Sequence, residues 1–334
     1  MAAAAAIASR KIGKNLNRHA YLLVQIRAHG EEGNALKATK KNDAPMPPSV
    51  ERLITEALAI QAEEAQEAGA IGFMARAMVQ ATLPHRRVAG PVFERKNGAF
   101  RLTLLAPPET GLPYGTVPRL LLAWLTTEAV RTRERELVLG ESMSGFMREL
   151  GLVPTGGRWG SITRLKDQTT RLFASTVSAV YKDGEQTRLL NRSIADEATL
   201  WWHPKSPNQA GLWQSTVLLS EPFFREMIER PVPVDMRALK ALKRSPLALD
   251  AYVWLTWRMS YLKQPTVVPW PALAAQFGSD YKLLRQFKAA FLVELRKVLA
   301  VYPGARVNEG DDGLLLTPSR THVRRAAKAL PDAG

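Results

Sequence analysis

The sequence predicts an α+β, mainly helical protein with two tandem winged helix-turn-helix domains that follow an N-terminal extension. Two observations predict this fold class. The tripeptide Trp-Leu-Thr occurs in two helix-periodic stretches, at positions 124–126 and 254–256, which are 130 residues apart. After each copy, the same order is expected: a β-prone run, a short helix ending near a glycine, a longer basic helix and a hairpin. This is the element order of a winged helix-turn-helix domain.

The composition favours a protein that binds polyanions. The chain has 334 residues, with 46 Lys and Arg against 31 Asp and Glu, and a net charge of +15. Such a charge attracts nucleic acid most commonly. A basic membrane-surface protein is the alternative, but no long Lys/Arg-rich amphipathic helix accompanies a lipid-anchor motif. The absence of cysteine excludes disulfides, thiolate metal sites and Cys nucleophiles, and fits a reducing compartment.

The first third of the chain divides at a proline-rich breaker. Residues 1–48 are predicted to be a basic, flexible arm and linker that ends in Pro45-Met46-Pro47-Pro48. Residues 49–108 are predicted to be an N-terminal extension of helices and a hairpin. The expected elements are a helix over 50–68 with Ser49 as its N-cap, a helix over 72–81, a loop with the basic cluster His85-Arg86-Arg87, and a hairpin over 91–106 around Asn97-Gly98.

The first winged-helix domain is predicted over residues 109–219. Its boundary is the proline- and glycine-rich stretch before Val117. The expected elements are a core helix over 117–129, a strand over 136–139, a helix capped by Ser142 and stopped at Gly151, a helix over 158–175, a hairpin over 177–194, and strands over 200–202 and 213–219.

The second winged-helix domain is predicted over residues 220–320, and a basic tail over 321–334. The expected elements are helices over 221–229, 235–242 and 245–262, a strand over 266–268, a helix over 271–277 ended by Gly278, a helix over 280–302, and a hairpin over 306–316.

The helix from Asp280 to Tyr302 is the strongest local signal. Its predicted apolar face contains Leu283, Leu284, Phe287, Phe291, Leu295 and Val298. Its opposite side has the candidate DNA-binding residues Tyr281, Lys282, Arg285, Gln286 and Lys288. A recognition helix needs this arrangement, because one face anchors in the core while the start of the other face reaches base edges. An ordinary amphipathic helix with a solvated basic face is the alternative.

The first domain repeats this pattern on the helix over 158–175. Its candidate DNA-binding residues are Arg158, Ser161, Arg164, Gln168 and Arg171. The alternative is that this domain forms a dimer surface. The predicted hairpins and tail add Arg188, Arg306, Arg324 and Arg325 as candidates for phosphate contact. A merely solvated tail is the alternative for the last two.

The sequence lacks the residue patterns of the common DNA-processing enzymes. The five histidines are scattered without a His-x-His pair, and no phosphate-binding loop motif occurs. His322-Val323-Arg324-Arg325 matches a fragment of the tyrosine-recombinase site, but no tyrosine follows it to act as the nucleophile. Acidic residues are too sparse for a two-metal nuclease. We therefore predict no catalytic residue, no metal site and no cofactor.

An ordered series of residues resembles the plasmid-encoded RepA replication initiators. The series consists of residues 112–125, Leu139-Gly140, residues 146–152, Leu200-Trp201-Trp202, Phe223-Phe224 and the stretch from Val268 to Gly278. The resemblance covers roughly residues 90–325 and leaves the first 90 outside. It implies two winged-helix domains, binding to repeated sequences at a plasmid origin in the bacterial cytoplasm, melting of the adjacent DNA, and recruitment of the host initiator and replicative helicase. It also implies that the second domain reads the repeat and that the first contacts DNA or forms a homodimer.

Two alternative functions share part of this argument. A winged-helix transcriptional regulator without origin function would use the same residues. A nicking or strand-transfer enzyme would need the catalytic motifs that the sequence lacks.

Overall fold

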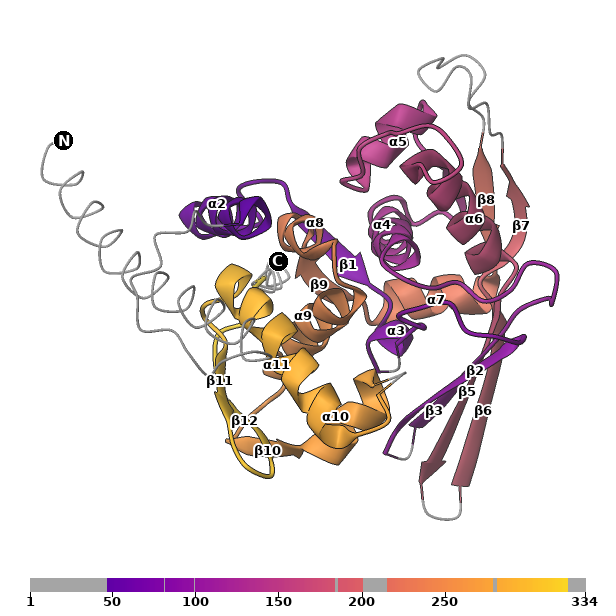
Figure 1. Ribbon diagram of the computed structural model, residues 1–334. Helices are drawn as coiled ribbons and strands as arrows, with labels where there is room; N and C mark the ends of the chain where they lie inside the picture. The colour runs from indigo at the N-terminus through magenta and orange to yellow at the C-terminus, as the bar shows by residue number, and fades with distance from the viewer. Residues whose placement is uncertain are drawn as a thin grey trace, which may run out of the picture.

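The computed structural model describes residues 47–80, 82–98, 100–183, 186–200, 215–278 and 281–323 of a mixed α/β protein (Figure 1). The segment before the first Trp-Leu-Thr helix contains α2 (Pro48–Ala62), β1 (Ile71–Met74), α3 (Arg76–Gln80), β2 (Val92–Asn97) and β3 (Phe100–Leu105). The basic arm predicted over residues 1–48 lies outside the described residues except for its last two positions.

Two runs of elements with the same order make up most of the rest. The first repeat consists of α4 (Val117–Thr132), β4 (Glu136–Val138), α5 (Met143–Glu149), α6 (Ser161–Phe173), β5 (Thr176–Asp183) and β6 (Gln186–Ser193). The second repeat consists of α9 (Pro246–Met259), β10 (Thr266–Pro269), α10 (Trp270–Phe277), α11 (Leu284–Val301), β11 (Arg306–Glu309) and β12 (Gly313–Thr317). Between the repeats lie β7 (Ala195–Thr199), β8 (Thr216–Leu219), α7 (Glu221–Glu229), β9 (Val232–Asp235) and α8 (Met236–Leu242).

The buried contacts of the two Trp-Leu-Thr tripeptides are equivalent. Trp124 on α4 packs edge-on against Phe146 of α5, with ring centroids 4.9 Å apart. Trp254 on α9 packs in the same way against Phe277 of α10, at 5.6 Å. The threonine of each tripeptide donates its hydroxyl hydrogen bond to the backbone carbonyl four residues earlier. The sequence repeat therefore corresponds to a repeated packing of the first helix on the second.

The sheets of the two repeats differ. In the second repeat, β10 pairs with β12 of the hairpin, and the sheet order is β10-β12-β11. In the first repeat, β4 pairs with β8 instead, and the hairpin of β5 and β6 joins β3. The same element order thus leads to a single three-stranded sheet in the second repeat, whereas the strands of the first repeat belong to two separate sheets.

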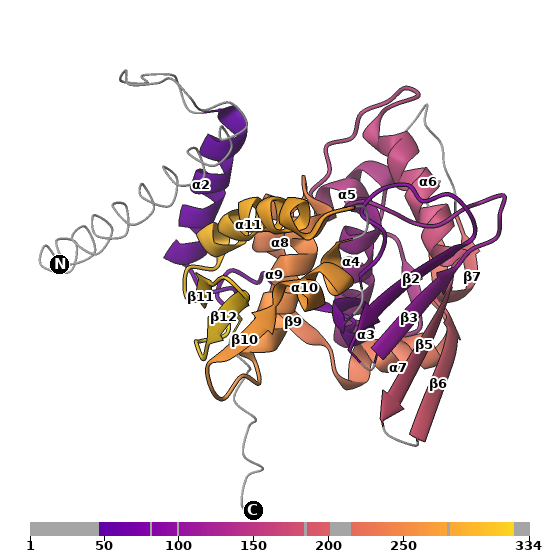
Figure 2. The ribbon, with the colours of Figure 1, turned by 60° about the horizontal axis from the view of Figure 1, so that its bottom comes forward.

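The N-terminal segment is shared between both repeats. Helix α2 packs against α8 and α11, whereas β2 and β3 extend the hairpin of the first repeat into a four-stranded sheet on the opposite side of the molecule (Figures 1 and 2). Between them, β1 pairs with β9 and packs on α4. A Cβ atom at Gly72 would lie 2.3 Å from the Met236 sulfur, so a larger residue here would force the flexible Met236 side chain to move.

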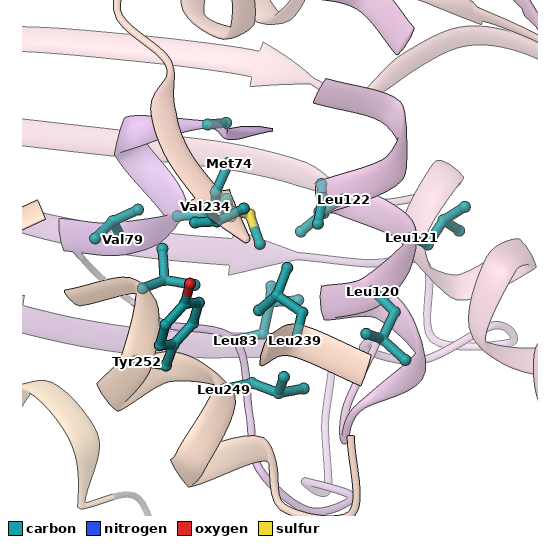
Figure 3. Close-up of a cluster of buried hydrophobic side chains, with 14 of the residues drawn as sticks. Met74, Val79, Leu83, Leu120, Leu121, Leu122, Val234, Leu239, Leu249 and Tyr252 are labelled. Carbon is teal, nitrogen blue, oxygen red and sulfur yellow. The ribbon is translucent and has the colours of Figure 1, made fainter. Parts of the chain in front are cut away.

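One continuous hydrophobic core joins these parts. Figure 3 shows one cluster with side chains from the N-terminal segment, from α4, from the elements between the repeats and from α9: Met74, Val79, Leu83, Leu120, Leu121, Leu122, Val234, Leu239, Leu249 and Tyr252. The N-terminal segment and the two repeats therefore share one hydrophobic core instead of having separate ones.

A buried ionic network lies beside this core. Asp250 of α9 accepts hydrogen bonds of 2.7 Å from Nε and from Nη2 of Arg119 on α4, and its Oδ2 lies 2.8 Å from His85 Nε2. Arg119 also donates to the carbonyls of Leu83 and Gly115. Burial lowers the pKa of His85, against the hydrogen bond to Asp250. Burial alone would raise the pKa of Asp250, but the charge of Arg119 and both hydrogen-bonding partners lower it.

Several predicted boundaries differ from the observed ones. The first helix begins at Pro48, so Ser49 lies inside the helix instead of capping it, and the helix ends at Ala62 because Glu63 is extended. The helix predicted over 72–81 is wrong in its first half, where pairing with β9 makes β1 a strand. The strand predicted over 200–202 extends into residues 201–214, which lie outside the described part of the chain.

Candidate nucleic-acid interface

The residues around the start of α11 are exposed up to Gln286. The helix begins at Leu284, four residues later than predicted, because Leu283 is extended and its carbonyl accepts the first helical hydrogen bonds, from the amides of Gln286 and Phe287. Tyr281 and Lys282 therefore lie in the turn before the helix, and residues 281–286 are all exposed. From Phe287 onward a buried face appears. The start of α11 thus projects beyond the core, as direct contact with base edges requires.

The five predicted residues at this helix start have different surroundings. Lys282, Arg285 and Gln286 are exposed, and neither basic residue has an ion-pair partner among the described residues. Tyr281 packs edge-on against Phe287, with ring centroids 5.8 Å apart. Lys288 turns back to the hairpin, where its Nζ lies 3.1 Å from Glu309 Oε1 and 4.8 Å from the centroid of the Trp270 ring. Lys288 therefore joins α11 to the hairpin, and Arg285 and Gln286 are the side chains best placed to reach bases.

Arg306 and the C-terminal segment lie at the other end of the second repeat. Arg306 is exposed at the start of β11. The chain is held at His322, whose Nδ1 lies 2.7 Å from the Tyr252 hydroxyl and whose ring stacks on Tyr302. Burial lowers the pKa of His322. Arg324 and Arg325 lie outside the described residues.

The turn before α6 is internally bonded. Helix α6 begins at Ser161, later than predicted. The Ser161 hydroxyl donates to the Val153 carbonyl at 2.6 Å and accepts from the Thr155 amide at 2.9 Å. Its amide donates to the Thr155 hydroxyl. Gly157 in this turn has a φ of +86°, a conformation that favours glycine. The Ser161 hydroxyl therefore stabilises the turn and is already hydrogen-bonded within the protein, so it is not free to contact DNA.

Two further candidates on α6 have structural contacts. Gln168 is only 2% exposed, and its Oε1 accepts a 2.7 Å hydrogen bond from the Tyr114 amide. Arg171 pairs with Asp167 at 2.9 Å and its guanidinium lies 5.7 Å from the Tyr114 ring centroid. The spacing placed both on one polar face, but the C-terminal half of that face packs against the loop around Tyr114. We therefore remove Gln168 and Arg171 from the candidate DNA contacts.

The start of α6 forms one wall of a basic cleft. The cleft has a volume of about 690 Å³, and its lining includes Arg86, Arg87, Arg158, Arg164 and Trp159. Arg158 lies over the Trp159 ring, which is 82% exposed. The basic cluster at 85–87 is visible in the sequence, but its place in this cleft is not, because 71 or more positions separate it from Arg158 along the chain. The buried contact of His85 with Asp250 brings it there.

The remaining candidate, Arg188, lies on β6 opposite Tyr181 of β5.

Among the described residues, no group of three or more His, Cys, Asp or Glu side chains could hold a metal ion. No described helix is both long and apolar enough to cross a bilayer.

Residues 112–270 match the family model of the plasmid encoded RepA protein. This part of the chain is similar to the RepA family. The RepA segment runs from the loop before α4 to the first residue of α10, so it contains the whole first repeat, the buried network residues Arg119 and Asp250, and the start of the second repeat. Helix α11 and the basic cluster at 85–87 lie outside it. No curated protein matches the chain in sequence.

Solved structures of another protein resemble the fold. The crystal structure of domains 2 and 3 of RctB, determined with selenomethionine, has a TM-score of 0.50 and 13% sequence identity, and the match covers 74% of this chain and 96% of that chain. A second crystal structure of RctB domains 2–3 has a TM-score of 0.46 and 12% identity over 72% of this chain and 94% of that chain. At 13% identity, the first of these supports a common fold and nothing further.

Proposed function

We propose that this protein is a plasmid replication initiator that binds repeated sequences at the origin through two winged-helix domains. The domains we propose are residues 109–219 and 220–320. The exposed first turn of α11 carries the proposal, because it presents Arg285 and Gln286 clear of the core at the start of a long helix. Arginine pairs bidentately with guanine and glutamine with adenine in the major groove. The match of residues 112–270 to the RepA family model supports an origin as the target.

The two repeats have different parts in this proposal. The start of α11 reads bases, with Tyr281 and Lys282 beside it, and Arg306 on the hairpin contacts phosphate. The cleft at the start of α6 binds phosphates through Arg86, Arg87, Arg158 and Arg164. Arg188, Arg324 and Arg325 are further phosphate contacts that we infer from the sequence alone. Binding should be strongly salt-dependent, because phosphate neutralisation releases counterions.

The later steps of initiation follow from the RepA resemblance. We propose that the bound protein promotes melting of adjacent DNA in the bacterial cytoplasm and recruits the host initiator and replicative helicase. It acts without catalysis of its own, and the first winged-helix domain is the surface on which a repressing homodimer would form. A transcriptional regulator with the same domains is the second candidate, because every base-contacting residue would be the same.

Footprinting of a plasmid origin at physiological salt tests the proposal. Regularly spaced protection over direct repeats of about two helical turns is the expected result, since both domains would contact each repeat. Protection of one inverted repeat at a promoter would favour the regulator. Cleavage of supercoiled plasmid by the purified protein would overturn the non-enzymatic assignment.

A further inference from the structure

Two exposed leucines lie at the start of α11, beyond the core. Leu284 is the first residue of the helix and precedes Phe287 by three positions, a spacing that places both on one helix face. Leu283 is the extended residue directly before the helix. Phe287 is 1% exposed, but Leu283 and Leu284 are each 45% exposed. The periodicity predicted both as core residues, and this prediction is wrong. The core ends at Phe287, so Leu284 in the first turn of α11 and Leu283 directly before it both lie where the chain projects from the domain.

The surroundings of the leucines favour a polyanionic partner. Lys282 precedes them and Arg285 follows them directly, and both basic side chains are exposed. An apolar pair flanked by cations is unsuited to a buried protein interface, because burying those cations without partners has a high energetic cost. Duplex DNA provides both partners, since its phosphates can neutralise Lys282 and a guanine edge in the groove can accept hydrogen bonds from Arg285. The two leucines would then need an apolar group of the DNA to contact, in a groove bordered by phosphates.

The major groove contains one such group. Of the four bases, only thymine presents a methyl group there, at C5, and apolar side chains contact it. We propose that Leu283 and Leu284 recognise thymine methyl groups, so that this protein selects thymine at positions next to the bases read by Arg285 and Gln286. This inference rests on the proposed function, because it requires the start of α11 to enter the major groove.

Uracil substitution tests the inference, because deoxyuridine differs from thymidine only by this methyl group. The probe is the duplex that the full-length protein selects from a random-sequence pool, synthesised once with thymine and once with uracil. We expect affinity for the uracil duplex to fall roughly fourfold for each methyl group contacted. Incorporation of 5-bromodeoxyuridine, whose bromine fills the methyl position, should restore binding.

Matched variants assign the effect to the leucines. The double variant Leu283→Ala, Leu284→Ala should bind the thymine duplex more weakly and no longer distinguish it from the uracil duplex. Leu105→Ala, which alters an exposed leucine on β3, should keep the wild-type discrimination. Thermal unfolding should be unchanged in the double variant, since both side chains are already exposed.

Two results would overturn the inference, and they are distinguishable from failure of the proposed function. Equal affinity of the wild type for the thymine and uracil duplexes would remove thymine recognition while leaving sequence-specific binding intact. The same holds if the double variant keeps the full discrimination. If the selection yields no preferred duplex at all, both the inference and the proposed initiator function fail.

Discussion

The starts of α6 and α11 occupy the same position in the two repeats, yet their side chains are used differently. At α6, Ser161 bonds the preceding turn, Gln168 is buried against the Tyr114 amide, and Arg171 is paired with Asp167. At α11, all of residues 281–286 are exposed, and only Lys288 turns back to the hairpin. Of the residues predicted on α6, Arg158 and Arg164 therefore remain exposed, whereas Tyr281, Lys282, Arg285 and Gln286 all remain exposed at the start of α11.

Under the proposed function, this difference predicts that the two helices contribute differently to DNA binding. At the start of α6, Arg158 and Arg164 line a cleft together with Arg86 and Arg87, which come from a loop far away in the sequence. Clustered arginines without a projecting helix turn suit phosphates, which carry no sequence information. We therefore expect the first repeat to supply affinity and the second to supply specificity, and each of the following predictions tests a part of this division.

The largest effect is expected from the network that holds the cleft in place. Asp250→Ala leaves Arg119 buried without its carboxylate, which should lower the free energy of unfolding by about 3–5 kcal/mol. Urea denaturation measures this. Asp196→Ala, which removes an exposed partner of Arg135, is the control and should cost about 1 kcal/mol or less. Equal losses in the two variants would mean that the network is not needed to join the parts.

Arg285→Ala tests base reading by α11. Loss of a bidentate contact should weaken binding to the preferred duplex by about 1–3 kcal/mol, with little change for a random duplex. Competition binding at constant salt measures both. Arg225→Ala, at an exposed position on α7, is the control. If Arg285→Ala weakens binding to both duplexes equally, the residue contacts phosphate and does not read a base.

The double variant Arg86→Ala, Arg87→Ala tests the cleft. It should weaken binding to all duplexes alike, and the slope of log K against log salt should fall in magnitude by about 1.8, the value for two phosphate contacts. The double variant Arg131→Ala, Arg225→Ala removes two exposed arginines elsewhere and should leave the slope unchanged. A loss restricted to the preferred duplex would assign the loop to base reading instead.

Gln168→Ala and Arg164→Ala separate structure from binding on one helix. Gln168→Ala should lower the free energy of unfolding by about 1 kcal/mol, because the Tyr114 amide loses its acceptor, and leave DNA affinity unchanged. Arg164→Ala should do the reverse, since this side chain is exposed in the cleft. Thermal unfolding and duplex binding of both variants would reveal any exchange of these roles.

The smallest effect is expected from pH. Burial lowers the pKa of His85 and of His322 below the ordinary value of 6.5. As the pH falls from about 6.5, the unfolded chain binds protons that the folded chain does not, so the free energy of unfolding should decrease. Urea denaturation at pH 7.5 and pH 5.5 measures this, and the double variant His85→Gln, His322→Gln should show a smaller difference. A wild type equally stable at both values would contradict neutral burial of these imidazoles.

The sequence by itself determined the local elements and their order. The spacing of apolar residues predicted α4, α7 and α9 closely, and Ser142 caps α5 through the Gly145 amide as expected. The repeated Trp-Leu-Thr predicted a repeated packing, and the ordered series starting at Leu112 predicted the RepA family. These features depend on residues close together in the chain, so they are visible in the sequence.

Only the tertiary structure decided which side chains remain available to a ligand. Leu283 and Leu284 have the spacing of core residues, but the core ends at Phe287 and leaves both leucines exposed. Gln168 has the spacing of a DNA contact, but the loop around Tyr114 covers it. Arg86 and Arg87 reach the start of α6 because His85 contacts Asp250, a residue 165 positions away. Exposure and long-range proximity depend on which other element covers a face, and no local pattern contains that information.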